Sequence, residues 1–249
     1  NLNTLDLGYN TLETIPGSLG KLKEATKFVF RDNHINKIPE SLWVHAASND
    51  LTFSLGHLDL DNNRLTEIPK GIGHAKRLHD LFLSNNSLST IPIDDLKHLK
   101  SLKLLNFDGN NIKEIPVGIE KLATLVEIQL QNNRYITLVP KSLGNLKYLE
   151  LLDLRNNSVS NLEETMFDNS NKMHLLYVHR NPLCSNGWVE KIKSKRMMEL
   201  IVDSATMDSG AGCRAQCSPY CHDYFANDYC LAACNSAACN YNNGMCVNE

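Results

Sequence analysis

A single pattern recurs along residues 2–181 and constrains the fold of this chain more than any other feature. Its first copy combines apolar residues at fixed spacings with one asparagine and an Ile-Pro step: Leu2, Leu5, Leu7, Asn10, Leu12, Ile15, Pro16, Leu19 and Leu22. The asparagine returns after 23, 30, 23, 24, 23, 24 and 24 residues, at Asn10, Asn33, Asn63, Asn86, Asn110, Asn133, Asn157 and Asn181. Eight copies in register predict a solenoid of stacked repeats.

The pattern L-x-x-L-x-L-x-x-N-x-L-x-x-I-P is identified as that of leucine-rich repeat proteins. Each L-x-L segment is expected to form a short strand whose leucines point into the core, because side chains alternate along a strand. One repeat cannot bury its leucines alone, whereas stacked repeats form a continuous core. The predicted fold is an α/β solenoid, a horseshoe with a parallel sheet on its concave side, followed by a small disulfide-rich module.

The eight repeated asparagines, here called the framework asparagines, are interpreted as structural residues. A buried amide without hydrogen-bond partners would cost a few kcal/mol. We expect each side chain to bond backbone groups of its own turn and of the neighbouring turn. The proline of the Ile-Pro step fixes φ on the convex side and removes a backbone donor that has no strand to pair with.

The outward residues of the strands line the concave face, where we expect a ligand to bind. Repeats three to five place an acidic patch there, which consists of His57, Asp59, Asp61, Asp80, Phe82, Asn106 and Asp108. Repeats seven and eight place more apolar residues there, namely Leu151, Asp153, Arg155, Leu175, Tyr177 and His179. Exposed apolar and aromatic side chains beside charges are typical of interaction sites. We predict that this second set binds a protein or peptide ligand, with scattered surface leucines as the alternative.

Two irregular repeats interrupt the period. Repeat two is longer than the others, and its extra residues lie near Trp43–Asp50, a segment predicted to bulge from the convex side. Repeat six has one extra residue before Pro140.

The first residue of the chain already lies inside a repeat, and no cap precedes it. We therefore expect the sequence to be a fragment of a longer protein.

Composition excludes some functions. The formal net charge is −3, which gives no general attraction for nucleic acid. No apolar run approaches the roughly 18 residues of a membrane span, although a membrane anchor could lie outside this sequence. Asn85 and Asn156 begin N-N-S sequons and are candidate glycosylation sites in a secreted protein.

All eight cysteines lie in the last third of the chain, at Cys184, Cys213, Cys217, Cys221, Cys230, Cys234, Cys239 and Cys246. An even number in a short segment favours disulfide bonds and therefore an oxidising compartment. Zinc is the competing interpretation. It is disfavoured because the segment lacks repeated C-x2-C pairs, and its one histidine, His222, has no partner at the H-x3–5-H spacing.

The segment NPLCSNGWVEKIKSKRMMELI begins at Asn181 and is predicted to be helical, with Trp188, Val189 and Ile192 on one face. It resembles the cysteine-bearing C-terminal cap of extracellular leucine-rich repeat proteins. The resemblance implies that residues 182–213 cover the end of the solenoid of residues 1–181. The cap of that family usually carries two disulfide bonds. Here only Cys184 and, by elimination, Cys213 are available, so we predict a reduced cap with one bond, Cys184–Cys213.

The remaining residues, 214–249, resemble a Lin-12/Notch repeat, the small calcium-binding module of Notch receptors. The last four cysteine intervals and the motif C-N-x-A-x-C-x-x-x-x-G-x-C carry this resemblance, whereas spacing alone leaves 15 pairings open. The family's pairing implies three bonds: Cys217–Cys239, Cys221–Cys234 and Cys230–Cys246.

Calcium is a candidate cofactor of this module, because the family binds one calcium ion. The resemblance places ligands at Tyr224, Asn227, Asn242 and Met245, with the backbone carbonyl of Leu231. The family's acidic ligands are thus replaced, and calcium prefers several hard oxygens. Asn227 and Asn242 keep an oxygen, and Asp223 or Asp228 could substitute for a lost carboxylate. A module held by disulfides alone is favoured.

The sequence contains no P-loop, G-x-S-x-G, H-E-x-x-H or glycine-rich dinucleotide motif, so we expect no enzyme activity. We predict non-enzymatic protein recognition or adhesion, outside the cell or at its surface. An intracellular signalling scaffold is the alternative, because repeats of this kind also resemble those of the cytoplasmic Ras-suppressor class. The cysteine-rich segment discriminates between the two, since a reducing cytosol would leave it unfolded. Control of proteolysis, as in Notch, rests on analogy alone.

Overall fold

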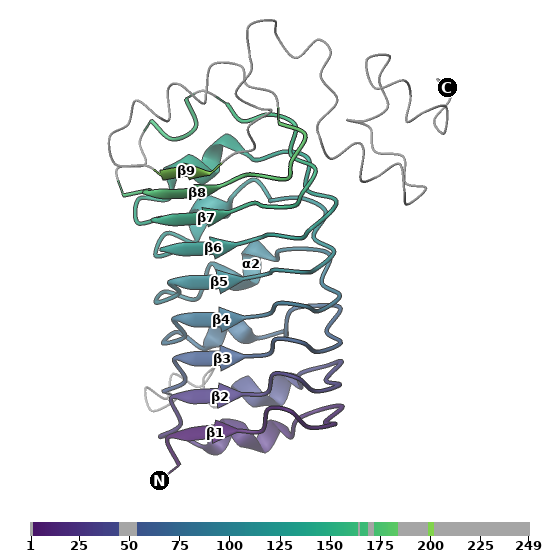
Figure 1. The fold of residues 1–249 in the computed structure, drawn as a ribbon. Coiled ribbons are helices and arrows are strands. Elements are labelled where there is room, and N and C mark those ends of the chain that lie inside the picture. Colours follow the sequence, from purple (N-terminus) through teal and green to yellow (C-terminus); the bar gives the residue numbers. More distant parts are fainter. Residues whose placement is uncertain (1, 45–53, 164, 169–171, 184–198, 202–249) are drawn as a thin grey trace, which may run out of the picture.

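The computed structural model describes residues 2–44, 54–163, 165–168, 172–183 and 199–201 (Figure 1). Within them the chain winds into a stack of similar coils, each of which contributes one short strand to a single parallel sheet. The strands follow one another in sequence order: β1 (Thr4–Asp6), β2 (Lys27–Val29), β3 (His57–Asp59), β4 (Asp80–Phe82), β5 (Leu104–Asn106), β6 (Glu127–Gln129), β7 (Leu151–Asp153), β8 (Leu175–Tyr177) and β9 (Glu199–Ile201). This sheet confirms the predicted solenoid.

The strand register follows the repeat pattern. The central residue of every strand pairs with the central residue of its neighbours, as Leu58 does with Leu81 and Leu105 with Ile128. Those central side chains point into the core, and from β2 to β8 they are almost fully buried. The residues on either side of them point away from the core and line the concave face.

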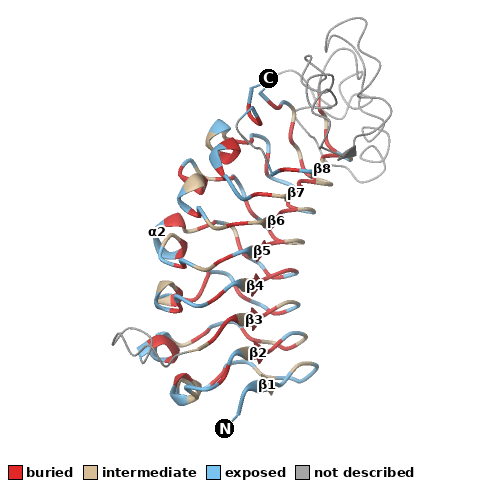
Figure 2. Ribbon diagram, turned by 90° about the vertical axis from the view of Figure 1, so that its left-hand side faces the viewer, coloured by how far each residue is buried: buried red, intermediate tan, exposed pale blue. Residues whose placement is uncertain are grey.

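Short helices form the opposite layer. Most are single turns of 3-10 helix that begin just after a proline or glycine: η1 (Gly17–Lys21), η2 (Glu40–Trp43), η3 (Ile72–His74), η4 (Ile119–Lys121) and η5 (Lys141–Asn145). One turn is α-helical, α2 (Ile93–Leu96). Figure 2 shows these helices on the outer side of a gentle curve and the strands on its inner side. The sheet is therefore the concave face.

A single hydrophobic core runs between the two layers along the whole stack. In repeat two, Ala25, Phe28 and Phe30 replace leucines and are fully buried, and the two phenylalanine rings pack with centroids 5.7 Å apart. Trp43 corrects one prediction. We expected the longer repeat two to bulge from Trp43 onward, but this side chain is buried at the end of η2 because it packs beside Gly71. Residues 45–50 of that segment lie outside the described residues.

The framework asparagines connect successive coils. The side chain of Asn110 donates from Nδ2 to the carbonyl oxygens of Leu83 (2.8 Å) and Phe107 (3.0 Å). Its Oδ1 accepts the N–H of Leu88 in the preceding coil (3.0 Å). Bonds to the preceding coil recur at the other interior positions: Asn33, Asn63, Asn86, Asn133, Asn157 and Asn181. Only the Oδ1 of Asn157 has a different donor, the N–H of Asn133, because repeat six contains the extra residue.

The residue before each framework asparagine adopts a left-handed conformation that the sequence analysis did not anticipate. The φ values lie between +51° and +62° at Tyr9, Asp32, Asn62, Asn85, Gly109, Asn132, Asn156 and Arg180. Asparagine, aspartate and glycine tolerate this conformation best and fill six of the eight positions. The turn directs the chain out of the sheet and brings the next asparagine into the core.

The ninth strand corrects a second prediction. We expected one helix to run from Asn181 through Ile201, but residues 199–201 form β9, which pairs in parallel with β8. The sequence carries a signal for this strand, because Met197, Leu200 and Val202 repeat the spacing of Met173, Leu176 and Val178 after 24 residues. The asparagine is absent from this copy. The remainder of the proposed cap and the whole of residues 214–249 lie outside the described residues, as do the disulfides and calcium ligands predicted there.

Candidate functional site

The concave face carries the ten outward residues that we take as candidates for ligand binding: Asp59, Asp61, Asp80, Phe82 and Asp108 of the acidic patch, and Leu151, Arg155, Leu175, Tyr177 and His179 of the second set. Each repeat supplies two outward strand residues and a third residue just beyond the strand. Nine of the ten side chains are half-buried, as expected for the inner side of a curve: Asp61, Asp80, Phe82, Asp108, Leu151, Arg155, Leu175, Tyr177 and His179. They form a central acidic zone on repeats three to five and a C-terminal zone on repeats seven and eight.

Asp59 is the exception. Its side chain lies on the concave face in register, but the residue is only 8% exposed, and its Oδ1 accepts the backbone N–H of Asp61 (3.1 Å). Strands about 4.8 Å apart bring the neighbouring side chains close enough to cover it. Asp59 is thus part of the buried support for this face, although the sequence analysis counted it in the acidic patch. Asp153 is buried in the same way.

In the central acidic zone, carboxylates are tied to the adjacent coils. Asp61 accepts the backbone N–H of Ser84 (2.6 Å), and Asp108 accepts hydrogen bonds from Gln131 and Asn132 (2.7 Å each). Burial raises the pKa of Asp61 to about 6, against the opposing effect of the bond from Ser84, and the charges of Asp59 and Asp108 add to the increase. The carboxylates therefore stiffen this region.

Two histidines flank the next carboxylate along the sheet. Nδ1 of His57 lies 3.3 Å from Oδ2 of Asp80, and Nδ1 of His79 lies 3.0 Å from the same oxygen. The ring of His57 also packs on Phe82, with centroids 5.1 Å apart. Asp80 is thus largely occupied by partners within the protein. Across the described ranges, no group of three His, Cys, Asp or Glu side chains is arranged to hold a metal ion.

The C-terminal zone combines apolar and aromatic side chains with an arginine whose position is fixed by an aspartate. Leu151 and Leu175 are register partners on β7 and β8, so their half-exposed side chains lie side by side. Arg155 donates from Nε to both carboxylate oxygens of buried Asp153 (2.9 Å each). This hydrogen bonding raises the pKa of Arg155 above its ordinary value.

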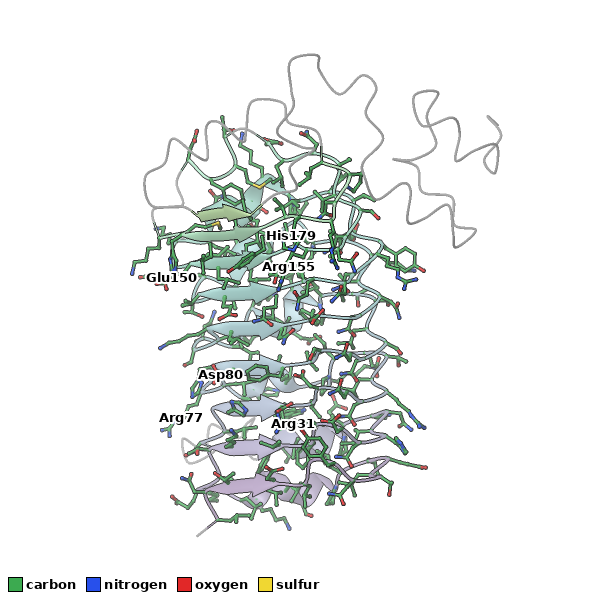
Figure 3. The ribbon with its side chains drawn as sticks, in the orientation of Figure 1. Arg31, Arg77, Asp80, Glu150, Arg155 and His179 are labelled. Atoms are coloured by element: carbon green, nitrogen blue, oxygen red, sulfur yellow. The ribbon has the colours of Figure 1, made fainter. Side chains whose placement is uncertain are left out.

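The guanidinium of Arg155 also lies over the ring of Tyr177, with 5.1 Å between Cζ and the ring centroid. This distance is within the range of a cation–π contact. His179 follows Tyr177 beyond the strand, and its buried Nδ1 has no hydrogen-bond partner. Figure 3 shows Arg155 and His179 near each other where the upper strands end, and Asp80 lower on the sheet near the strand starts. The C-terminal zone thus presents two leucines and a tyrosine fixed by an arginine.

The extra residue in repeat six displaces two apolar side chains from the repeat pattern. Tyr135 takes the position at which other repeats bury a leucine or isoleucine, but it is 58% exposed because Ile136 fills the core in its place. Leu138, in the same loop, is 69% exposed. The sequence analysis noted the insertion but did not anticipate this exposure. The signal was the apolar pair Tyr135 and Ile136 at a position that needs only one core residue.

Comparison with known families agrees with this architecture. The model described as "Leucine rich repeat" matches residues 53–112 and 123–183, and a second model of the same description matches residues 1–22. Together these ranges cover more than half of the chain. The chain belongs to the leucine-rich repeat proteins.

Several curated proteins are similar over part of this chain. The leucine-rich repeat-containing G-protein coupled receptor 5 of Rattus norvegicus is 35% identical over 105 residues, which are 42% of this chain and 11% of the receptor. Epiphycan of Mus musculus is 34% identical over 109 residues, or 41% of this chain and 30% of epiphycan. The probable serine/threonine-protein kinase pats1 of Dictyostelium discoideum is 37% identical over 92 residues, which are 36% of this chain and 3% of pats1. The matched region thus spans less than a third of each relative.

Solved structures show the same fold. A Leptospira interrogans leucine-rich repeat protein superposes with a TM-score of 0.66 at 26% identity, covering 80% of this chain and 54% of that one. The ectodomain of the Arabidopsis thaliana receptor kinase GASSHO1/SCHENGEN3, solved with CASPARIAN STRIP INTEGRITY FACTOR 2, gives 0.67 at 27% identity, covering 82% and 24%. The plant peptide hormone receptor RGFR1, solved with RGF2, gives 0.61 at 29% identity, covering 73% and 29%. Among the residues described for our chain, no helix is long and apolar enough to cross a membrane.

Proposed function

We propose that this chain is a non-enzymatic recognition protein that binds a protein or peptide through the C-terminal zone of its concave face. The residues assigned to contact are Leu151, Arg155, Leu175, Tyr177 and His179. We place the protein outside the cell or at its surface. The central acidic zone, with Asp61, Asp80, Phe82 and Asp108, is assigned a secondary role in the charge around the ligand.

One observation carries the proposal. Leu151 and Leu175 present adjacent apolar side chains on neighbouring strands of the sheet face, and Arg155 fixes Tyr177 beside them. Aromatic and arginine side chains in partly desolvated surroundings are those that most often dominate binding energy at protein interfaces. Asp153 already holds Arg155, which lies over Tyr177, so these two side chains would lose little entropy on binding.

The comparisons support the proposal at the level of fold and use. The two plant receptors are described in complex with named protein or peptide factors, and the curated relatives include a receptor and the proteoglycan-type protein epiphycan. Two similar solenoids have thus been solved as complexes with a protein or peptide partner. The particular residues proposed here rest on the geometry of this chain.

The experiment is a binding screen with matched variants. The wild-type chain, the double variant Leu175→Asp with Tyr177→Ala, and Leu104→Asp would be tested against an array of secreted proteins and receptor ectodomains. Leu104 occupies the same register position as Leu151 and Leu175, but on β5, and is similarly half-buried. Circular dichroism would first establish that all three chains are folded.

A ligand of the proposed surface should bind the wild type and Leu104→Asp alike and bind the double variant at least about 30-fold more weakly, corresponding to a loss of about 2 kcal/mol. If the ligands bind the double variant with the same affinity as the wild type, the C-terminal zone is not the binding surface. Ligands lost only from Leu104→Asp would move the site to the middle of the sheet.

The location is proposed from the cysteines. We retain residues 182–213 as a cap with one disulfide and residues 214–249 as a Lin-12/Notch-like module with three, with calcium as a candidate ligand of Asn227, Asn242 and Asp223. Intact mass with thiol labelling of the native chain, with and without a chelator, tests this assignment. Eight blocked cysteines support an oxidising compartment, whereas eight free ones would overturn it. Thiols that react with the label only in the presence of the chelator would show that calcium binds to the module and stabilises it.

An intracellular scaffold is the second candidate. The observation that favours it is the similarity to two Dictyostelium discoideum proteins, pats1 and Ras guanine nucleotide exchange factor V, the latter 31% identical over 89 residues. The same thiol measurement decides between the two locations. The concave face would serve as the binding surface in either case.

A further inference from the structure

We propose that Asn85 carries an N-linked glycan and that Asn156, the other sequon asparagine, does not. This inference rests on the extracellular location proposed above. Both residues begin N-N-S sequences, and both occupy the left-handed position just before a framework asparagine. They therefore lie on the same edge of the sheet, in repeats four and seven. Their surroundings differ in three respects.

The first difference is exposure. Asn85 is exposed, and its Nδ2 donates one hydrogen bond, to Oδ1 of Asn62 in the preceding coil (2.9 Å). A singly glycosylated amide keeps one N–H, so this bond can persist in the modified chain. Asn156 is half-buried, and its Nδ2 lies 2.6 Å from Oδ1 of Asn132. Asn132 is itself held by Asp108, so Asn156 ends a row of linked side chains.

The second difference is the neighbour in the following coil. Beside Asn85 this position is Gly109, where an added Cβ would lie 2.2 Å from Oδ1 of Asn85. A side chain at residue 109 would thus collide with the Asn85 amide, and glycine leaves that flank open. Beside Asn156 the equivalent position is Arg180. The following coil therefore places no side chain against the Oδ1 flank of Asn85, whose Nδ2 faces Asn62, but places a long side chain next to Asn156.

The third difference is the hydroxyl of the sequon. Ser87 is exposed, whereas the Oγ of Ser158 donates to the carbonyl oxygen of Arg134 (2.7 Å) and is half-buried. Glycosylated sequons lie in surface loops of secreted proteins. Only the Asn85 sequon offers both groups to solvent.

The modification is a group transfer from a lipid-linked pyrophosphate oligosaccharide, which the secretory pathway supplies. Nδ2 of Asn85 forms a bond to the anomeric carbon of the first sugar and loses one proton. The bond between that carbon and the phosphate oxygen breaks, and the lipid pyrophosphate leaves. The product is a neutral, solvated chain of sugars on an exposed turn.

The position of this glycan is compatible with the proposed binding surface. Asn85 lies three coils from Asn156, or roughly 14 Å at about 4.8 Å per strand. A glycan there would border the central acidic zone and leave Leu175 and Tyr177 open. A glycan on Asn156 would follow directly on Arg155 and would compete with the ligand. Glycan at Asn85 alone is thus the arrangement that keeps the C-terminal zone free.

The test is secretion of the full 249-residue chain from a mammalian cell line behind a cleavable leader. Intact mass before and after peptide N-glycosidase, with the released site marked by conversion of asparagine to aspartate in 18O-water, gives occupancy at each sequon. The variants are Ser87→Ala, its conservative control Ser87→Thr, and Asn156→Gln. Ser87→Ala leaves Asn85 and its backbone conformation in place, so loss of glycan would not reflect misfolding.

We expect one glycan, at Asn85, which is lost in Ser87→Ala and retained in Ser87→Thr and Asn156→Gln. A wild-type chain with unmodified Asn85, or with its glycan on Asn156, would overturn the inference. Either result could coincide with eight oxidised cysteines and intact ligand binding, which would leave the proposed function standing. Loss of binding with a glycan at Asn85 would overturn the function and not the glycan.

Discussion

Replacing Asn110 with alanine tests the idea that the framework asparagines hold successive coils together. Asn110 lies in a regular part of the stack and is buried. Its amide connects the backbone of repeats four and five. Asn10 offers a matched control at the end of the stack, because it is exposed and bonds only to the carbonyls of Leu7 and Gly8 in its own turn.

The magnitude follows from which groups lose their last partner. The carbonyls of Leu83 and Phe107 would keep bonds from Asn86 and Asn133 after the change. The buried N–H of Leu88 would have no acceptor, which costs about 1–3 kcal/mol. The lost Nδ2 bonds add about 0.5–1.5 kcal/mol each. We therefore expect Asn110→Ala to destabilise the fold by about 3 kcal/mol and Asn10→Ala by less than about 1 kcal/mol.

Urea denaturation followed by circular dichroism would compare the two variants with the wild type. Because a solenoid need not unfold in two states, hydrogen exchange at the Leu88 amide would provide a local measurement. That amide should exchange much faster in Asn110→Ala and at the wild-type rate in Asn10→Ala. Equal stabilities of the two variants, or an unchanged Leu88 exchange rate, would refute the reasoning.

Three further predictions concern single sites. Ile136→Ala should cost about 2–5 kcal/mol in urea melts and Tyr135→Ser less than about 0.5 kcal/mol, because only Ile136 is in the core; similar costs would contradict the description of the repeat-six insertion. Gly144→Ala should lower the melting temperature sharply, because its Cβ would lie 1.6 Å from the carbonyl oxygen of Met166; a wild-type value would disprove the close approach. Asp61→Asn should be more stable than the wild type at pH 7 but not at pH 4. The pKa of Asp61 is about 6 in the folded chain and 3.8 in the unfolded chain, so the unfolded chain loses this proton at lower pH and the stability of the wild type falls as the pH rises from about 4 to 6. Parallel stability–pH curves for the two proteins would contradict the assignment.

Periodicity made most of the solenoid predictable. The first eight strands lie where the L-x-L segment, or its phenylalanine-containing equivalent, precedes a framework asparagine, because only that register buries both apolar side chains and lets the asparagine bond two coils. The ninth strand was missed because its copy of the pattern has no asparagine and follows a lysine-rich run that reads as helix. Trp43 was misplaced because length alone does not show where an insertion leaves the core.

The sequence predicted which residues lie on the concave face but not how far each of them is buried. Alternation correctly placed Asp59 and Asp153 on the outer side of their strands, yet both are buried. The carboxylate of Asp153 is covered in part by Arg155, two residues later in the same repeat, and alternation along a strand does not show that one outward side chain folds over another. The pairing of Arg155 with Tyr177 likewise requires the spatial register of β7 and β8.

The most direct test of the account is a hydrogen-exchange footprint of the chain bound to the first ligand that the array identifies. Our proposal predicts slower exchange in residues 150–156 and 174–180 on binding, with little change in β1, β2 or the convex helices η1 to η5. Protection confined to the convex helices, or to the coils before β6, would contradict the claim that the C-terminal zone of the concave face is the binding surface.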